Sequence, residues 1–196
     1  GGHTGVRSLV HLACDTHYTE MVDYLMDKAV NKTMTDSLGN TLVHYLCREG
    51  YSEHLSKIST TQFLNQNLAG FTGLHFAAKA DNLSLVNALL SFQKGASELE
   101  DESHKLALDY ATSPDVLRVL IRSLDNVNQI QQSFCRLLSK PNGALLSDRL
   151  DVFLDAHGDA LKLGGKGFTA ALIAAGSYSD NQYALRRLLS EGWPVT

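Results

Sequence analysis

A nine-residue pattern recurs along the chain, and it constrains the fold more than any other feature. Its two best copies are GNTLVHYLC at residues 39–47 and GFTGLHFAA at residues 70–78. Residues 8–14 (SLVHLAC) carry the core of another copy, so histidines fall at positions 11, 44 and 75, with spacings of 33 and 31. A weaker copy at residues 105–111 has an aspartate at the histidine position, 34 residues further on. A period in the low thirties is typical of stacked supersecondary units rather than of one continuous globular core.

Each copy of the pattern is followed by a second apolar segment with helical spacing. After the first copy, Met21, Val22, Leu25 and Met26 fall on one stripe of a helix. We therefore expect units that each consist of a helix, a turn and a second helix. The later second helices are predicted at residues 52–58, 83–91 and 115–121.

Two local signals mark where these helices end and begin. Gly95 follows the second helix of the third unit, at a position where a helix commonly ends with a left-handed residue. Ser113 followed by Pro114 is a helix start signal, with serine as the N-cap and proline at the first helical position.

The pattern is less regular in the last third of the chain. We predict a degenerate unit whose helices cover residues 133–138 and 145–156, separated by a break at 140–143 and ending at 157–159. The pattern returns at residues 167–175 (GFTAALIAA), and residues 181–190 are predicted as the last helix. The expected organisation is one domain over 1–196 with repeats at about 5–34, 35–66, 67–99, 100–129, 130–162 and 163–196.

This repeat resembles the ankyrin repeat. The second and third units carry the likeness best, in Gly39, Thr41, His44, Gly70, Thr72, His75, Ala77, Ala78, Gly95 and Ala96. The resemblance implies an all-α fold, an α-solenoid of stacked helix-turn-helix repeats joined by hairpin loops. It also implies that the histidines bridge the turns of neighbouring repeats by hydrogen bonds. Where the family usually has proline, which favours helix initiation, this chain has Leu9, Leu42, Gly73, Ala107 and Ala170.

The composition excludes several classes of partner and location. A net charge of −4 and a pI near 6.0 give no basis for nucleic acid or an anionic membrane as partner, because both favour a basic surface. Three cysteines without a C-x-x-C pair argue against a disulfide framework and a structural zinc site. No apolar run is long enough to span a bilayer. We expect an intracellular protein, in the cytoplasm or nucleus, without a cofactor.

Three short motifs have a chemical and a structural interpretation. The pairs His11/Cys14 and His44/Cys47 lie three residues apart, as a nucleophile and its base can on a helix, but the third copy has alanine at the cysteine position. Packing is therefore the favoured role of these cysteines.

The other two motifs lie near each other in the sequence. Residues 164–167 (GGKG) lack the preceding strand and the following hydroxyl residue of a phosphate loop. The acidic and histidine side chains at 155, 157 and 159 could suggest a metal site, but they fall at a predicted helix end, where charges are expected to be solvated.

The resemblance implies a partner surface built from the hairpin tips and the exposed positions of the first helices, which together line a concave face. The apolar side chains at predicted tips, Leu38, Leu68, Phe71 and Phe168, are the most informative, because tips normally face water. The full set of candidate contacts is Arg7, Asp15, Thr16, Ser37, Leu38, Asn40, Arg48, Glu49, Leu68, Ala69, Phe71, Lys79, Lys105 and Phe168.

The function that the resemblance implies is a non-catalytic protein-binding module with another protein as partner. The first and last units lack a polar outer cap, so we expect the chain to be a fragment of a longer protein and monomeric as such. The alternative is a regulatory or targeting domain of a larger enzyme, channel or pathogen effector whose activity lies elsewhere. A hydrolase that uses Cys14 or Cys47 is a further alternative, which the reactivity of the thiols would decide.

Overall fold

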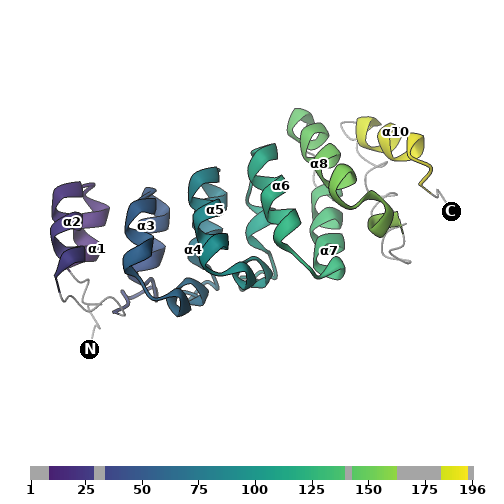
Figure 1. The fold of residues 1–196 in the computed structure, drawn as a ribbon. Coiled ribbons are helices and arrows are strands. Elements are labelled where there is room, and N and C mark those ends of the chain that lie inside the picture. The colour runs from purple at the N-terminus through teal and green to yellow at the C-terminus, as the bar shows by residue number, and fades with distance from the viewer. Residues whose placement is uncertain (1–8, 29–33, 140–142, 163–181, 194–196) are drawn as a thin grey trace. The chain divides into compact units, whose positions relative to one another are not determined.

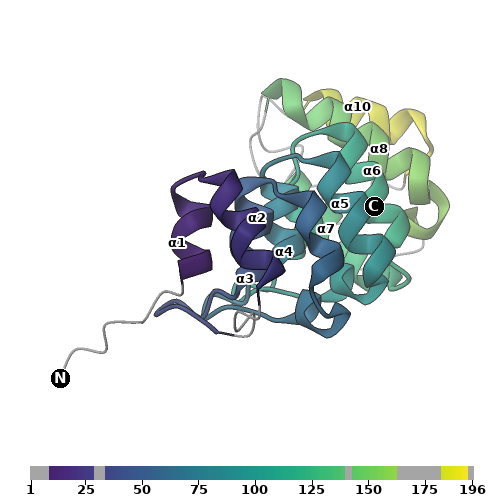
Figure 2. The same cartoon turned by 60° about the vertical axis from the view of Figure 1, so that its left-hand side comes forward.

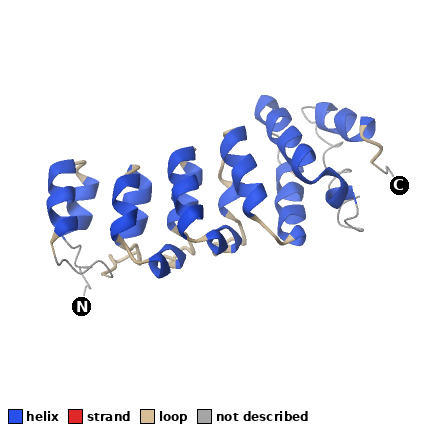
Figure 3. Cartoon of the chain, viewed as in Figure 1, coloured by secondary structure: helices blue, strands red, loops and turns tan. Residues whose placement is uncertain are grey.

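The computed structural model describes residues 9–28, 34–139, 143–162 and 182–193, and every regular element in these ranges is helical (Figure 1, Figure 3). The predicted all-α class is confirmed. The chain forms two compact units, Gly1–Tyr110 (unit 1) and Ala111–Thr196 (unit 2), each of which is described by itself. The predicted single domain over 1–196 and its repeat boundaries stay predictions.

Unit 1 is built from pairs of helices that follow one another in chain order. Its elements are α1 (Leu9–Asp15), α2 (Thr19–Asp27), α3 (Leu42–Glu49), the 3-10 helices η1 (Ser52–Lys57) and η2 (Thr60–Leu64), α4 (Gly73–Lys79), α5 (Leu83–Phe92), and the 3-10 helices η3 (Lys94–Glu98) and η4 (Ala107–Asp109). Helix α3 packs against α1 on one side and α4 on the other, and α4 also contacts η4. Figures 1 and 2 show the connectors of this unit gathered at one end of the helices.

Two of the motif histidines, His44 and His75, connect neighbouring hairpins, as the resemblance implies. The backbone N–H of Thr41 donates to Nδ1 of His44 at 2.9 Å, so the ring proton lies on Nε2. That nitrogen donates to the carbonyl oxygen of Phe71 in the next hairpin at 2.8 Å. His75 repeats the arrangement, with Nδ1 3.1 Å from the N–H of Thr72 and Nε2 3.3 Å from the carbonyl oxygen of Lys105. Each histidine thus caps its own helix and binds the following hairpin.

Small residues allow the helices of unit 1 to approach closely. Ala77 and Ala78 are fully buried in α4, and Cys47 occupies the position equivalent to Ala78 in α3. Gly73 begins α4, and a Cβ atom placed there would lie 2.8 Å from both Sγ of Cys47 and Cγ1 of Val43. The family's proline would therefore collide with α3, which gives a packing reason for glycine at this position.

Two predictions for unit 1 need correction. The second helix of the second unit is the 3-10 helix η1, which buries only His54 and Leu55 and so has too little apolar surface to anchor a longer α-helix. Gly95 does not adopt a left-handed conformation, because the chain turns at the extended Gln93 and continues as η3. Left-handed glycines occur instead at Gly39, Gly50 and Gly70.

Unit 2 is organised around its longest helix. The described helices are α6 (Pro114–Ser123), α7 (Val127–Leu138), α8 (Gly143–Lys162) and α10 (Gln182–Ser190), and α8 contacts each of the other three. The ring of Phe134 lies 5.3 Å from that of Phe153 and 5.8 Å from that of Trp193, measured between centroids. These aromatic contacts tie α7, α8 and the segment after α10 into one core.

The helices of unit 2 begin and end at residues that the sequence only partly predicts. Pro114 begins α6 as expected. Helix α7 begins at Val127, six residues before the predicted start, because the side chain of Asn126 caps it by accepting from the N–H of Asn128 at 3.0 Å. The predicted helix end at 157–159 is wrong, since α8 continues through Gly158, a residue that costs a helix about 1 kcal/mol without breaking it. The motif at 167–175 lies outside the described residues.

Candidate partner-binding surface

The hairpin tips of unit 1 are each held by one side-chain acceptor. Oδ1 of Asp36 accepts from the backbone N–H groups of Leu38 and Asn40, both at 2.8 Å. Oδ1 of Asn67 accepts the same two bonds from the N–H groups of Ala69 and Phe71 at 2.9 Å, and Oδ1 of Asp101 accepts them from Ser103 and Lys105 at 2.7 and 3.0 Å. Short polar side chains of this kind stabilise tight turns by mimicking a backbone acceptor.

A tyrosine nine residues further on binds the second oxygen in two of the three tips. The hydroxyl of Tyr45 donates to Oδ2 of Asp36 at 2.8 Å, and the hydroxyl of Tyr110 donates to Oδ2 of Asp101. Burial opposes ionisation of Asp36, but the hydrogen bonds that Asn40, Tyr45 and Leu38 donate outweigh it and lower its pKa. The carboxylate therefore stays charged and holds the tip.

The tip of the third repeat lacks this pair. It has Asn67 in place of the aspartate and Phe76 in place of the tyrosine. The Nδ2 group of Asn67 instead donates to Oδ1 of Asn40 at 2.7 Å, which joins this tip to the preceding one. Phe76 has no hydroxyl to donate, and Asn67 has an NH2 group in place of the second carboxylate oxygen that would accept it.

Neighbouring tips are also joined through their backbones. The N–H of Leu68 donates to the carbonyl oxygen of Leu38 at 2.9 Å. The N–H of Glu102 donates to the carbonyl oxygen of Ala69 at 3.1 Å. The side chains of Leu38 and Leu68 remain 61% and 74% exposed on this bonded backbone. Two leucines therefore project into solvent from fixed positions on adjacent tips.

Three charged residues at the ends of α1 and α3 form a closed network. The guanidinium of Arg48 binds Asp15, donates from Nε to Oε1 of Glu49 at 2.6 Å, and lies 4.7 Å above the ring of Tyr45. Oε2 of Glu49 is also 3.4 Å from Nδ1 of His17. The positive charge of Arg48 is therefore balanced within the protein.

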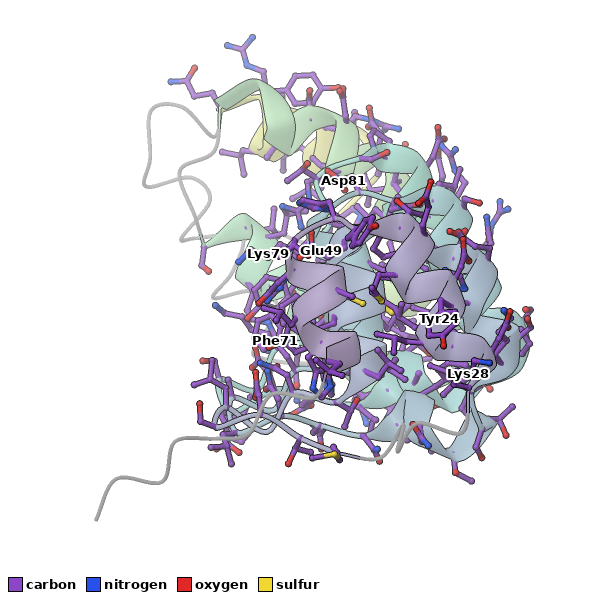
Figure 4. The ribbon with its side chains drawn as sticks, turned by 90° about the vertical axis from the view of Figure 1, so that its left-hand side faces the viewer. Tyr24, Lys28, Glu49, Phe71, Lys79 and Asp81 are labelled. Atoms are coloured by element: carbon purple, nitrogen blue, oxygen red, sulfur yellow. The ribbon has the colours of Figure 1, made fainter. Side chains whose placement is uncertain are left out.

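Lys79 occupies the position of Arg48 in the following repeat and is exposed. It forms no ion pair among the described residues. Figure 4 shows Phe71, Lys79 and Glu49 on one side of the helices, with Tyr24 and Lys28 on the opposite side. We call the surface made by the tip residues Leu38, Leu68 and Phe71 and by Arg48, Glu49 and Lys79 on α3 and α4 the front face.

A row of aromatic contacts accompanies the histidines. The rings of His11 and Tyr45 are 4.7 Å apart, those of His44 and Phe76 are 6.0 Å apart, and those of His75 and Tyr110 are 6.0 Å apart. The repeat pattern by itself does not single out these aromatic residues as a group. The signal was present, because each directly follows a histidine or the aspartate that replaces it.

Phe71 adds a further ring where the third and fourth motif copies meet. Its centroid lies 5.2 Å from that of His75, 5.4 Å from that of Phe76 and 5.0 Å from that of Tyr110. Phe71, Phe76 and Tyr110 are each partly exposed.

The structure distributes the predicted contact residues unequally. Asn40 is 6% exposed and uses both side-chain atoms in hydrogen bonds to Asp36 and Asn67, so its predicted contact with a partner is unsupported and its role is to hold the tips. Arg7 and Phe168 lie outside the described residues. Asp15, Glu49, Phe71 and Lys105 are partly exposed, and Thr16, Ser37, Leu38, Arg48, Leu68, Ala69 and Lys79 are exposed.

The buried cysteines do not have the properties of activated nucleophiles. Burial raises the pKa of Cys14 to about 12, and the nearby carboxylates of Glu49 and Asp15 add to the effect. Burial also raises the pKa of Cys47. A catalytic thiol needs the opposite shift, so these pKa values do not favour Cys14 or Cys47 as the nucleophile of a hydrolase.

The described residues offer neither a metal site nor a membrane-spanning helix. Within them, no group of three or more histidine, cysteine, aspartate and glutamate side chains is placed to hold a metal ion. Nor does any helix of these ranges combine the length and the apolar character needed to cross a bilayer.

Comparison with family models identifies one of the repeats directly. Residues 69–101 match the ankyrin-repeat family model. The chain contains an ankyrin repeat. The matched ankyrin repeat comprises α4, α5 and η3 and coincides closely with the third predicted unit, so the predicted ankyrin repeat is confirmed for these residues. Ankyrin repeats generally act as non-catalytic modules that bind other proteins, which supports this general function here.

Proposed function

We propose that unit 1 binds a partner protein on its front face, which corresponds to the concave face of the repeat family. The proposal depends on one observation, the exposure of Leu38 and Leu68 on tips whose backbones are hydrogen-bonded to each other. Exposed apolar side chains that are close together favour a contact surface over a solvent-facing loop.

The bonded tips support a mechanism of rigid presentation. Each tip backbone is held by Asp36, Asn67 or Asp101, and the histidines tie successive hairpins together. A partner that docks on such a surface pays little conformational entropy to order it, which leaves more of the contact energy for affinity. A binding module and a targeting domain of a larger enzyme, channel or effector would use this face in the same way.

Affinity capture from cell extract, followed by binding measurements with the purified partner, tests the proposal. The informative variant is Leu38→Glu/Leu68→Glu, because both side chains are largely exposed and their replacement leaves the core intact. The matched control is Tyr24→Glu/Tyr183→Glu, which places two carboxylates at residues that are 58% and 50% exposed and do not belong to the front face.

We expect the leucine variant to bind the partner at least about tenfold more weakly, because two carboxylates without partners would be buried in the contact in place of two apolar side chains. The tyrosine control should bind like the wild type. Equal retention of the partner by the leucine variant and the wild type would place the binding site elsewhere. The identity of the captured protein would also distinguish a simple binding module from a targeting domain.

A further inference from the structure

The third repeat and the segment that follows it carry a strip of side chains that the repeat scaffold does not require. The rings of Phe76, Phe71 and Tyr110 follow one another with centroid separations of 5.4 and 5.0 Å. In the preceding repeat the position of Phe71 is occupied by the buried Asn40, and that of Phe76 by Tyr45, which is fully buried beneath Arg48. A repeat of this chain can therefore fold and pack without an exposed aromatic strip.

A lysine stands at each end of this strip. Nζ of Lys105 lies 5.5 Å from the centroid of the Tyr110 ring. Lys79 follows Phe76 by three residues on α4, so the two side chains are neighbours on the same side of the helix. In the part of the chain that the structure describes, neither lysine forms an ion pair, in contrast to Arg48 with its two carboxylates.

We propose that this strip, consisting of Phe71, Phe76, Tyr110, Lys79 and Lys105, binds an acidic peptide segment with an aromatic residue between its acids. The inference rests on the proposed function and names its partner class. Aromatic rings prefer to pack edge-to-face or offset against another ring. The two ammonium groups provide charge complementarity to carboxylates, which sets specificity more than affinity.

The geometry limits the length of the segment. Phe76, Phe71, Tyr110 and Nζ of Lys105 follow one another at separations of 5.4, 5.0 and 5.5 Å. An extended chain advances at most about 3.3–3.6 Å per residue, so a segment of about five residues reaches along them. The expected motif is an acidic residue, an aromatic residue two positions later, and a second acidic residue two positions after that. The overall charge of −4 makes the two lysines a local feature, which disfavours a phosphate-rich surface as the ligand.

Selection from a phage-displayed library of random linear peptides tests this inference, with the complete 196-residue chain as the target. Wild-type protein should enrich peptides with aspartate or glutamate on both sides of an aromatic residue. The variant Lys79→Glu/Lys105→Glu should instead enrich lysine or arginine at these positions. Lys28→Glu/Arg122→Glu is the matched control, because it changes the net charge equally at two exposed residues that are not part of the strip.

The best enriched peptide is then synthesised with a fluorophore, and its affinity is measured by anisotropy. We expect binding to weaken at least about tenfold with Lys79→Glu/Lys105→Glu and to stay within about twofold with the control, differences of about 1.4 and 0.4 kcal/mol. Replacing the acids of the peptide with their amides should reproduce the loss, and raising the salt concentration should weaken binding.

Several outcomes would overturn the inference. Enrichment of peptides without acids, an unchanged motif with the lysine variant, or no enrichment above an empty bait would each do so. If vesicles of phosphatidylserine bind the protein while no acidic peptide does, the lysines recognise phosphate instead. If peptides are lost with Leu38→Glu/Leu68→Glu but not with the lysine variant, the proposed function stands and this inference fails. If neither the library nor the cell extract yields a partner, both fail.

Discussion

Replacing Gly73 by alanine tests the close approach of α4 to α3. A Cβ atom at this position would lie 2.8 Å from Sγ of Cys47 and from Cγ1 of Val43. Both of these side chains are fully buried and cannot move into solvent. Overpacking of this kind costs about 1–3 kcal/mol, and alanine recovers at most about 1 kcal/mol through its better helix propensity.

We therefore expect Gly73→Ala to lower the free energy of unfolding by about 1–2 kcal/mol. In urea denaturation followed by circular dichroism, this corresponds to a midpoint lower by roughly 0.5–1 M, because the slope for small proteins is about 1–3 kcal/mol per M. Gly73→Pro, which restores the residue usual in the family, should destabilise the protein at least as much. The apparent consensus improvement is thus expected to be harmful in this repeat.

A control and a double-mutant cycle separate packing from backbone effects. Gly95→Ala is the control, because a Cβ atom there has no neighbour within 4 Å, and it should be neutral or slightly stabilising. Cys47→Ala removes one of the two clashing atoms, so Gly73→Ala should cost about 0.5–1 kcal/mol less in that background. If Gly73→Ala stabilises the protein as Gly95→Ala does, or if the cycle is additive, the argument from close approach is wrong.

Three further predictions follow from the glycine, histidine and cysteine environments of unit 1. Gly70→Ala should destabilise more than Gly73→Ala in the same urea assay, because φ is +77° and the new Cβ atom would lie 2.6 Å from a backbone nitrogen. Burial lowers the pKa values of His44 and His75, although the hydrogen bonds that they donate to the next hairpins oppose this shift. The stability that these neutral histidines contribute is therefore complete above their unfolded-state pKa near 6.5 and is lost as the pH falls below it. The urea midpoint should decrease between about pH 7.5 and 5.5, and a constant midpoint would contradict this. With its pKa near 12, Cys14 should react with a thiol reagent at pH 8 much more slowly in the folded protein than in urea, as should Cys47, and rapid labelling of the folded protein would contradict their burial.

The repeat pattern predicts the helix pairs of unit 1 because its spacing reflects a recurring physical unit. Glycine recurs where the backbone turns, threonine where the helix is capped, and histidine where the next hairpin is bound. These residue types therefore determine the local geometry. The spacing does not predict exposure. Asn40 and Phe71 occupy equivalent positions, yet one is buried by hydrogen bonds between tips and the other lies in an aromatic cluster.

The errors have a common physical cause. Gly95 and Gly158 are both consistent with a helix end in sequence, but contacts made elsewhere decide whether the chain stops there. In the same way, Gly73 looks like a weak helix start until the side chains of α3 are placed beside it. Local propensity is a small term of about 1 kcal/mol, and packing against a neighbouring helix exceeds it.

The bonds from each histidine to the following hairpin also determine how unit 1 would respond to force. Because Nε2 of His44 and of His75 bind carbonyl oxygens of the hairpin after their own, each repeat is completed by its C-terminal neighbour. Pulling on the ends of the chain would therefore detach repeats one after another instead of opening all of them together. Each event would release about 33 residues, a length increment of roughly 110 Å that single-molecule extension resolves.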